Sequence, residues 1–189
     1  MSDIYLALIH HPVYDKEHIV VTTSITNMDI HDISRSAKTY GVKRFFVVNP
    51  VPTLRALAEK ILEHWQVGYG STYNVTRKDA LAIVSLTETL EETLQVVRDT
   101  AGEVPQIIAT SAKDGGKRLS FPELRSRIAV PGPPFLLLLG TGWGLTEEVL
   151  DQANDFLEPI HGVGTYNHLS VRAAAAILLD RLLGAPSVN

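Results

Sequence analysis

Two loops near the C-terminus carry the residues best suited to grip a ligand. Residues 135–145 read Phe-Leu-Leu-Leu-Leu-Gly-Thr-Gly-Trp-Gly-Leu, an apolar run that predicts a buried strand followed by a glycine-rich turn. Residues 159–177 read Pro-Ile-His-Gly-Val-Gly-Thr-Tyr-Asn-His-Leu-Ser-Val-Arg-Ala-Ala-Ala-Ala-Ile, a glycine-containing loop that leads into a helix. Because glycine lets the backbone turn sharply or approach a neighbour closely, both loops are candidates for holding a ligand through main-chain groups.

The glycine-rich turn does not identify its ligand by spacing. Its glycines fall at positions 140, 142 and 144, which differs from the G-x-G-x-x-G pattern of dinucleotide-binding turns. It also lacks the Lys-Ser/Thr pair of a P-loop. A tight strand-to-helix turn without a ligand therefore stays open as an alternative. In the second loop, Ser170 is predicted to cap a helix that Gly184 ends.

Strands and helices are predicted to alternate along the chain, which indicates an α/β protein with a mostly parallel sheet. Residues 69–78 are polar and aromatic and are expected to form an exposed loop. A helix is expected to begin at Asn27 or Asp29, and another at Thr87. The expected strands are residues 4–9, 19–22, 43–49, 80–86, 106–109 and 136–139, and the further expected helices are residues 52–65, 120–130 and 146–153.

Composition narrows the possible functions. The chain has 189 residues, which suits one domain over residues 1–189, and it has no cysteine for disulfides or thiolate chemistry. His10 and His11 are adjacent in a strand and point to opposite faces, so no metal site is expected. No signal peptide and no membrane-spanning run is found, which predicts a cytoplasmic protein without a membrane partner. A net charge of −4 argues against an indiscriminate nucleic-acid binder, yet it permits a local basic patch.

The two C-terminal motifs together resemble the last two motifs of the SPOUT superfamily of RNA methyltransferases. Leu-Gly-Thr-Gly-Trp-Gly-Leu and Tyr-Asn-His-Leu-Ser-Val-Arg are similar to signatures of a small SPOUT family of S-adenosylmethionine-dependent RNA methyltransferases. The resemblance spans nearly the whole chain and implies an α/β fold with a mostly parallel sheet, helices on both faces and a C-terminal deep trefoil knot. The alanines at positions 173–176 suit such a knot, because small residues allow tight packing against threaded chain.

The resemblance also implies a reaction and its partners. S-adenosylmethionine is the implied cofactor and S-adenosylhomocysteine its product. The implied substrate is an RNA, either tRNA or rRNA, methylated on a ribose hydroxyl or a base nitrogen. Many SPOUT enzymes are homodimers with active sites at the interface, so a homodimer is expected here.

Site residues follow from the same resemblance, position by position. Asn27 and Arg35 match the first SPOUT motif, in which an asparagine starts a helix and an arginine on that helix serves the active site, although residues 28–34 depart from its usual small-residue segment. Arg172 is a second catalytic candidate. Asn167 and Ser170 have the alternative role of anchoring the loop, which is favoured for Ser170. The implied cofactor-binding residues are Thr110, Ser111, Ala112, Leu139, Gly140, Thr141, Gly142, Gly144, Leu145, Ile160, Gly162, Gly164, Asn167, Leu169 and Ser170.

Two other functions are compatible with parts of the sequence. A non-catalytic RNA- or nucleotide-binding protein that retains the knotted fold is suggested by the altered first motif and the acidic charge balance. A dinucleotide-dependent oxidoreductase is disfavoured, because no early strand is followed by a G-x-G-x-x-G turn and a helix.

Overall fold

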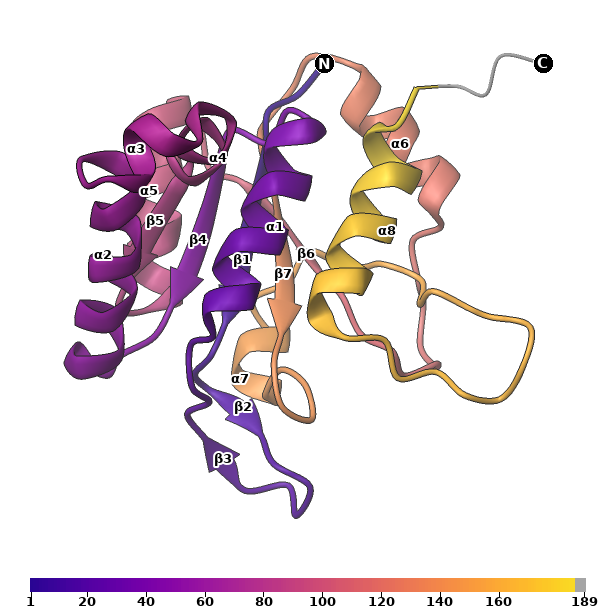
Figure 1. Ribbon diagram of the computed structural model, residues 1–189. Coiled ribbons are helices and arrows are strands. Elements are labelled where there is room, and N and C mark those ends of the chain that lie inside the picture. The colour runs from indigo at the N-terminus through magenta and orange to yellow at the C-terminus, as the bar shows by residue number, and fades with distance from the viewer. Residues whose placement is uncertain (186–189) are drawn as a thin grey trace.

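A computed structural model of the protein describes residues 1–185 and is built on a six-stranded parallel sheet (Figure 1). The strand order is β5-β4-β1-β7-β6-β8, and every neighbouring pair is parallel. A separate antiparallel pair, β2 and β3, forms a small hairpin between β1 and α1. The strands are β1 (Ile4–Ile9), β2 (Val13–Tyr14), β3 (Val20–Val21), β4 (Arg44–Val48), β5 (Val84–Thr87), β6 (Gln106–Ala109), β7 (Phe135–Gly140) and β8 (Asp155–Phe156).

The centre of the sheet is apolar on both faces, as the continuous apolar runs predict. All six residues of β1 are buried, and β1 pairs with β7 in a register that sets Leu6 beside Leu137. Alternate side chains of these strands feed two separate hydrophobic clusters, one on each face of the sheet. A parallel sheet needs such double burial, because its crossover helices cover both faces.

Helices cover the two faces unequally (Figure 1). One face packs against α1, α2, α4, α6 and α8, and the other packs against α5 and α7. The short helix α3 lies against α2 and α4. The helices are α1 (Asn27–Thr39), α2 (Pro52–Gln66), α3 (Gly70–Tyr73), α4 (Val75–Leu81), α5 (Leu90–Ala101), α6 (Phe121–Ala129), α7 (Glu147–Leu150) and α8 (Val171–Leu183).

The predicted α/β class is confirmed, and local capping signals placed several helices correctly. Ser120 and Glu123 form a complete capping box at the start of α6. The Ser170 side chain accepts from the Ala173 N–H and caps α8, and Gly184 follows the last turn of that helix. Strands β1 and β6 have the predicted bounds.

Other sequence predictions were wrong, and each has a local cause. The predicted loop at 69–78 holds α3 and the start of α4, because the Asn74 side chain accepts from the Arg77 N–H and caps α4. The predicted strand at 80–86 therefore starts only at Val84. Thr89, and not Thr87, caps α5, since Thr87 is the last residue of β5. Helix α7 spans Glu147–Leu150, shorter than the predicted 146–153.

No helix within residues 1–185 is long and apolar enough to cross a membrane. Over the same residues, no group of three or more histidine, aspartate or glutamate side chains is placed to hold a metal ion.

Candidate active site at the carboxyl edge of the sheet

Many of the predicted cofactor-binding residues lie in the loops that follow β6 and β7, whereas Arg35 lies further along α1. The connection from β1 leads to α1 on one face of the sheet, and the connection from β7 leads to α7 on the other face. In open α/β sheets, ligands bind in the crevice where neighbouring connections diverge in this way. The carboxyl edge of β1 and β7 is therefore the expected place for a ligand.

The glycine-rich turn after β7 is held by the hairpin β2–β3. The Trp143 N–H donates to the Tyr14 carbonyl at 2.8 Å, and the Tyr14 N–H donates to the Gly144 carbonyl at 2.9 Å. Gly142 has a φ of +58°, and a Cβ there would lie 2.7 Å from the Tyr14 carbonyl oxygen. Gly142 thus serves a close contact within the chain, whereas the sequence suggested a close contact with a ligand.

Gly140 and Leu145 meet in the same turn. A Cβ on Gly140 would lie 3.0 Å from the Leu145 side chain, which is buried. Leu139, at the end of β7, is also buried in the core. The side chains of Leu139 and Leu145 are buried and Gly140 has no side chain. These three residues, which the resemblance implies bind the cofactor, can therefore offer a ligand only their main-chain groups.

A chain of hydroxyls ties the glycine-rich turn to the connection between β1 and α1. The Thr141 hydroxyl donates to the Ile9 carbonyl at 3.0 Å and lies 2.5 Å from the Thr23 hydroxyl. The Thr23 hydroxyl lies 2.9 Å from Nδ1 of His10. His10 is 1% exposed, and its Nε2 has no hydrogen-bond partner in the part of the chain that the structure describes. Burial lowers the pKa of His10 to about 4, against the opposing effect of Asp29.

Acidification is expected to destabilise the protein through His10. Its pKa falls from 6.5 to about 4 on folding, so the unfolded chain takes up a proton at a higher pH than the native state. The stabilisation is complete above pH 6.5 and is lost as the pH falls through about 4. At about 1.4 kcal/mol per pKa unit, the free energy of unfolding should drop by roughly 2–3 kcal/mol between pH 7 and pH 4.5.

Urea unfolding at a series of pH values measures this drop, with His10→Asn as the comparison. The variant has no imidazole to titrate, so its stability should decline less over the same range. An equal decline in both proteins would show that other groups cause the pH dependence.

The loop after β6 and the loop before α8 are held to each other. Nδ2 of Asn167 donates to the Ala112 carbonyl at 2.9 Å, and Nε2 of His161 lies 3.3 Å from Oδ1 of Asp114. The side chain of Asn167 therefore anchors the loop, which was one of its two predicted roles.

The hydroxyls of the loop after β6 are also engaged within the chain. The Thr110 hydroxyl donates to the Leu138 carbonyl at 2.8 Å, and the Ser111 hydroxyl accepts from the Lys113 N–H at 3.0 Å. Because these hydroxyls hold the loop in place, a ligand at this part of the site would form its hydrogen bonds chiefly with main-chain groups.

The loop before α8 leaves space for such a ligand. A Cβ at Gly162 or Gly164 would meet nothing within 4 Å. Between and after these glycines, Val163, Tyr166 and Leu169 expose apolar surface, while Ile160 packs against the core. Exposed backbone flanked by apolar side chains matches a nucleoside with a polar edge and apolar faces. The residues present therefore fit S-adenosylmethionine.

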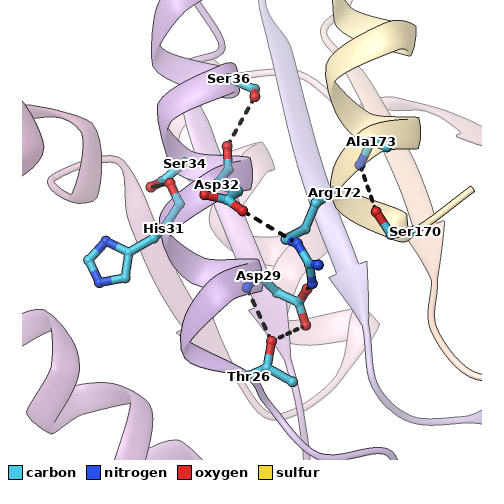
Figure 2. Close-up of polar contacts among 9 residues, drawn as sticks. All are labelled: Thr26, Asp29, His31, Asp32, Ser34, Ser36, Ser170, Arg172 and Ala173. Carbon is cyan, nitrogen blue, oxygen red and sulfur yellow. Dashed lines mark hydrogen bonds and ion pairs between the residues drawn. The ribbon is translucent and has the colours of Figure 1, made fainter.

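Arg172 reaches from the first turn of α8 to α1 (Figure 2). Its Nη1 lies 3.0 Å from Oδ1 of Asp29, and its Nε lies 3.4 Å from Oδ2 of Asp32. The Asp29 side chain is 8% exposed, and its other carboxylate oxygen accepts from the Thr26 hydroxyl at 2.6 Å. Thr26 also caps α1, a role that the sequence assigned to Asn27 or Asp29.

The structure does not bring the three catalytic candidates together. Asn27 is the exposed first residue of α1 and lies on the same side of that helix as His31, whereas Arg172 contacts the opposite side through Asp29 and Asp32. Arg35 is exposed and lies eight residues further along α1. At about 1.5 Å per residue, that is roughly 12 Å along the helix axis. Arg35 is therefore well separated from Asn27 within one chain.

Sequence reasoning missed three residues of this region. The sequence indicates a polar strand end at His10, gives no role to Thr23, and offers Asp29 as a helix cap or as a surface partner of Arg35, not of Arg172. The spacing of Thr26 and Asp29 resembles a capping box and was an available signal. No local signal links Thr23 to Thr141, which lies 118 residues away.

Solved structures of methyltransferases share this fold. A probable methyltransferase from Bordetella pertussis superposes with a TM-score of 0.64 at 18% identity, covering 96% of this chain and 94% of that chain. The TrmH/SpoU tRNA modifying enzyme of Aquifex aeolicus superposes with a TM-score of 0.57 at 14% identity, covering 97% and 75%. At these identities the matches show only that the chain shares its fold with these proteins, and this fold has the α/β class with a parallel sheet that the sequence predicted.

The family follows from the sequence itself. The family model described as SAM-dependent RNA methyltransferase matches residues 3–184, and the chain belongs to this family. It is 42% identical over 182 residues to the tRNA (guanine-N(1)-)-methyltransferase of Nitratidesulfovibrio vulgaris, covering 96% of this chain and 42% of that protein. It is 34% identical over 181 residues to an uncharacterized protein of Aquifex aeolicus, covering 96% and 88%. The chain thus spans less than half the length of the Nitratidesulfovibrio relative.

Proposed function

We propose that this protein transfers the methyl group of S-adenosylmethionine to a ribose hydroxyl or a base nitrogen of tRNA. The observation that carries the proposal is the pair of loops joined by Asn167 and Ala112, which leaves the backbone at Gly162 and Gly164 open. The family description supports the cofactor and the RNA, and the name of the Nitratidesulfovibrio relative favours tRNA over rRNA. Because the chain spans 42% of that relative, its guanine specificity is left to experiment.

The chain's own residues have three tasks in this reaction. When bound, S-adenosylmethionine supplies a methyl group already activated by its sulfonium. The three loops at the carboxyl edge hold reactants in line and limit water, which converts a bimolecular step into an oriented one. Asn27 is assigned the orientation of the acceptor, which its exposure at the start of α1 supports. The acceptor proton must also leave, and it is released to solvent water; Arg35, a permanent cation that cannot take up a proton, is assigned the orientation and activation of the acceptor oxygen or nitrogen.

A homodimer would let Arg35 act in the partner's site. Arg35 is exposed on α1 and separated from Asn27 of its own chain, so it is better placed to reach outward than inward.

We further propose that residues 1–189 act as one domain in the cytoplasm. The deep trefoil knot stays a prediction, supported by the packing of α8 against both α1 and α6.

Arg35→Ala is expected to keep cofactor affinity and to lose methyl transfer. General acid–base and positioning groups contribute roughly 10²- to 10⁴-fold, so transfer should fall by at least about a hundredfold. Calorimetry measures the affinity, and incorporation of labelled methyl into tRNA measures transfer. Lys38→Ala, in the last turn of the same helix, is the matched control. Full transfer by Arg35→Ala would remove this arginine from the reaction.

Labelled transfer into separated tRNA and rRNA, followed by nucleoside analysis, tests the proposed function. Label in one tRNA nucleoside supports the proposal and identifies the methylated atom. Label confined to rRNA would contradict the choice of tRNA.

A non-catalytic RNA-binding role is the second candidate. One observation favours it: Arg172 is occupied by Asp29 and Asp32, which leaves fewer free groups for chemistry. Bound S-adenosylmethionine without transfer into any cellular RNA would decide for this candidate.

A further inference from the structure

A groove of about 640 Å³ lies between α1, α2 and α4. His31 lines it and points to the side of α1 opposite Arg172 (Figure 2). The groove is separate from the loops that we assign to the cofactor, except that Asn27 stands at its border. Its lining residues are Ile25, Asn27, His31, Leu57, Lys60, Ile61, His64, Trp65 and Arg77.

Trp65 is fixed in this groove by its neighbours. The guanidinium carbon of Arg77 lies 4.6 Å from the indole centroid, and the rings of His31 and His64 meet the indole edge-on at 5.4 and 5.1 Å. A Cβ on Gly70 would lie 2.6 Å from the indole, so α3 packs directly against it. The Arg77 guanidinium lies over one face of the indole, and bases stack on both aromatic rings and guanidinium planes.

The lining carries cations and no carboxylate. Lys60 and Arg77 are its permanent positive charges, in a protein whose net charge is −4. Glu59 lies about 100° and Glu63 about 60° around α2 from Lys60, and neither carboxylate is among the residues that line the groove. Such a combination of positive charge with aromatic rings is what single-stranded nucleic acid requires, and it repels neither phosphate nor base.

His31 supplies a hydrogen-bonding group without a partner. Its Nδ1 is buried and has no hydrogen-bond partner among residues 1–185. Burial, followed by the charge of Arg77, lowers the pKa of His31, so the ring is neutral near pH 7. A neutral imidazole can donate or accept, which suits the mixed donor and acceptor edge of a base.

The groove leads back to the proposed methylation site. Thr23 contacts Thr141 of the glycine-rich turn, and the chain continues from Thr23 through Ile25 to Asn27 at the groove border. A polymer lying in the groove would thus present a neighbouring nucleotide to the carboxyl edge of β1 and β7.

We propose that the groove between α1, α2 and α4 binds a single-stranded segment of the RNA substrate, with one base stacked on Trp65 and Arg77 and a phosphate at Lys60. This deepens the proposed function and rests on it only for the choice of RNA as substrate. Tyr69, which precedes α3, and Tyr73, at its end, stack on each other at 5.8 Å and are exposed, but neither lines the groove.

Tryptophan fluorescence tests the proposal directly, because the chain has only two tryptophans. Trp143→Phe leaves Trp65 as the single reporter. We expect a short single-stranded RNA, titrated without cofactor, to quench Trp65 fluorescence saturably. In this background Lys60→Ala and Arg77→Ala should each weaken RNA binding about fivefold or more. Lys60→Ala should also reduce the slope of log K against log salt by about 0.7 for one lost phosphate contact.

Arg98→Ala is the charge-matched control, because Arg98 lies on α5 on the opposite face of the sheet and is exposed. Thermal melting confirms that each variant is folded. RNA binding that leaves Trp65 unquenched, or that is equal in Lys60→Ala, Arg77→Ala and Arg98→Ala, would overturn the proposal. Concentration-dependent quenching without RNA would instead assign the groove to a second copy of the chain. Since no cofactor is present, loss of S-adenosylmethionine binding would sink the proposed function and leave this result untouched.

Discussion

Gly142→Ala is expected to lower the free energy of unfolding by about 3 kcal/mol. A φ of +58° costs an alanine about 1–2 kcal/mol. The added Cβ would also lie 2.7 Å from the Tyr14 carbonyl oxygen, which is backbone and cannot move aside cheaply. Overpacking of this kind costs about 1–3 kcal/mol more. The turn and the hairpin β2–β3 must then separate, so cofactor affinity should fall about tenfold or more.

Gly162→Ala is the matched control for this substitution. Gly162 has no positive φ, and a Cβ there would meet nothing within 4 Å. Its stability should match that of the unmodified protein, while its cofactor affinity should fall if backbone at this position faces the ligand. Urea unfolding and calorimetry separate the two effects. A fully stable Gly142→Ala protein would show that the hairpin contact is not what requires glycine in the turn.

Arg172→Ala is expected to destabilise the protein by about 3 kcal/mol, which corresponds to a melting temperature lower by roughly 6–12 °C. The substitution leaves the Asp29 carboxylate, 8% exposed, without its cation and frees the first turn of α8 from α1. Asp32→Ala should cost under about 1 kcal/mol, because Asp32 is 53% exposed and its contact is longer, at 3.4 Å.

A double variant separates structural from catalytic loss. Arg172→Met combined with Asp29→Asn removes both charges and should regain much of the lost stability, because no buried charge is left unpaired. Methyl transfer that returns with stability would mark Arg172 as a positioning residue. Transfer that stays lost in the stable double variant would place Arg172 in the reaction. Equal stability of Arg172→Ala and the unmodified protein would contradict the ion pair with Asp29.

Local signals explain why much of the fold was predictable. The unbroken apolar runs of β1 and β7 could only be buried strands, and the capping residues Ser120 and Ser170 fixed the starts of α6 and α8. Each of these features depends on residues within four positions of one another. The two C-terminal motifs then led to the family through their resemblance to known enzymes, which the match over residues 3–184 confirms.

Features that depend on distant contacts could not be read from the sequence. Strand β8 has only two residues, and it is a strand because it pairs with the edge of β6. The need for glycine at 142 comes from Tyr14, and Arg172 depends on Asp29, which is 143 positions away. The groove was hidden because residues 69–78 were interpreted as a loop, whereas α3 and α4 close its side around Trp65.

Titration of the purified, cofactor-stripped protein with S-adenosylmethionine and S-adenosylhomocysteine, with NAD as the control, tests the central claim most directly. The account predicts saturable binding of both at roughly micromolar Kd, or about −8 kcal/mol, and no binding of NAD. Absence of binding by either sulfur compound, or preferential binding of NAD, would contradict it, because the loops at the carboxyl edge would then not form a site for the methyl donor.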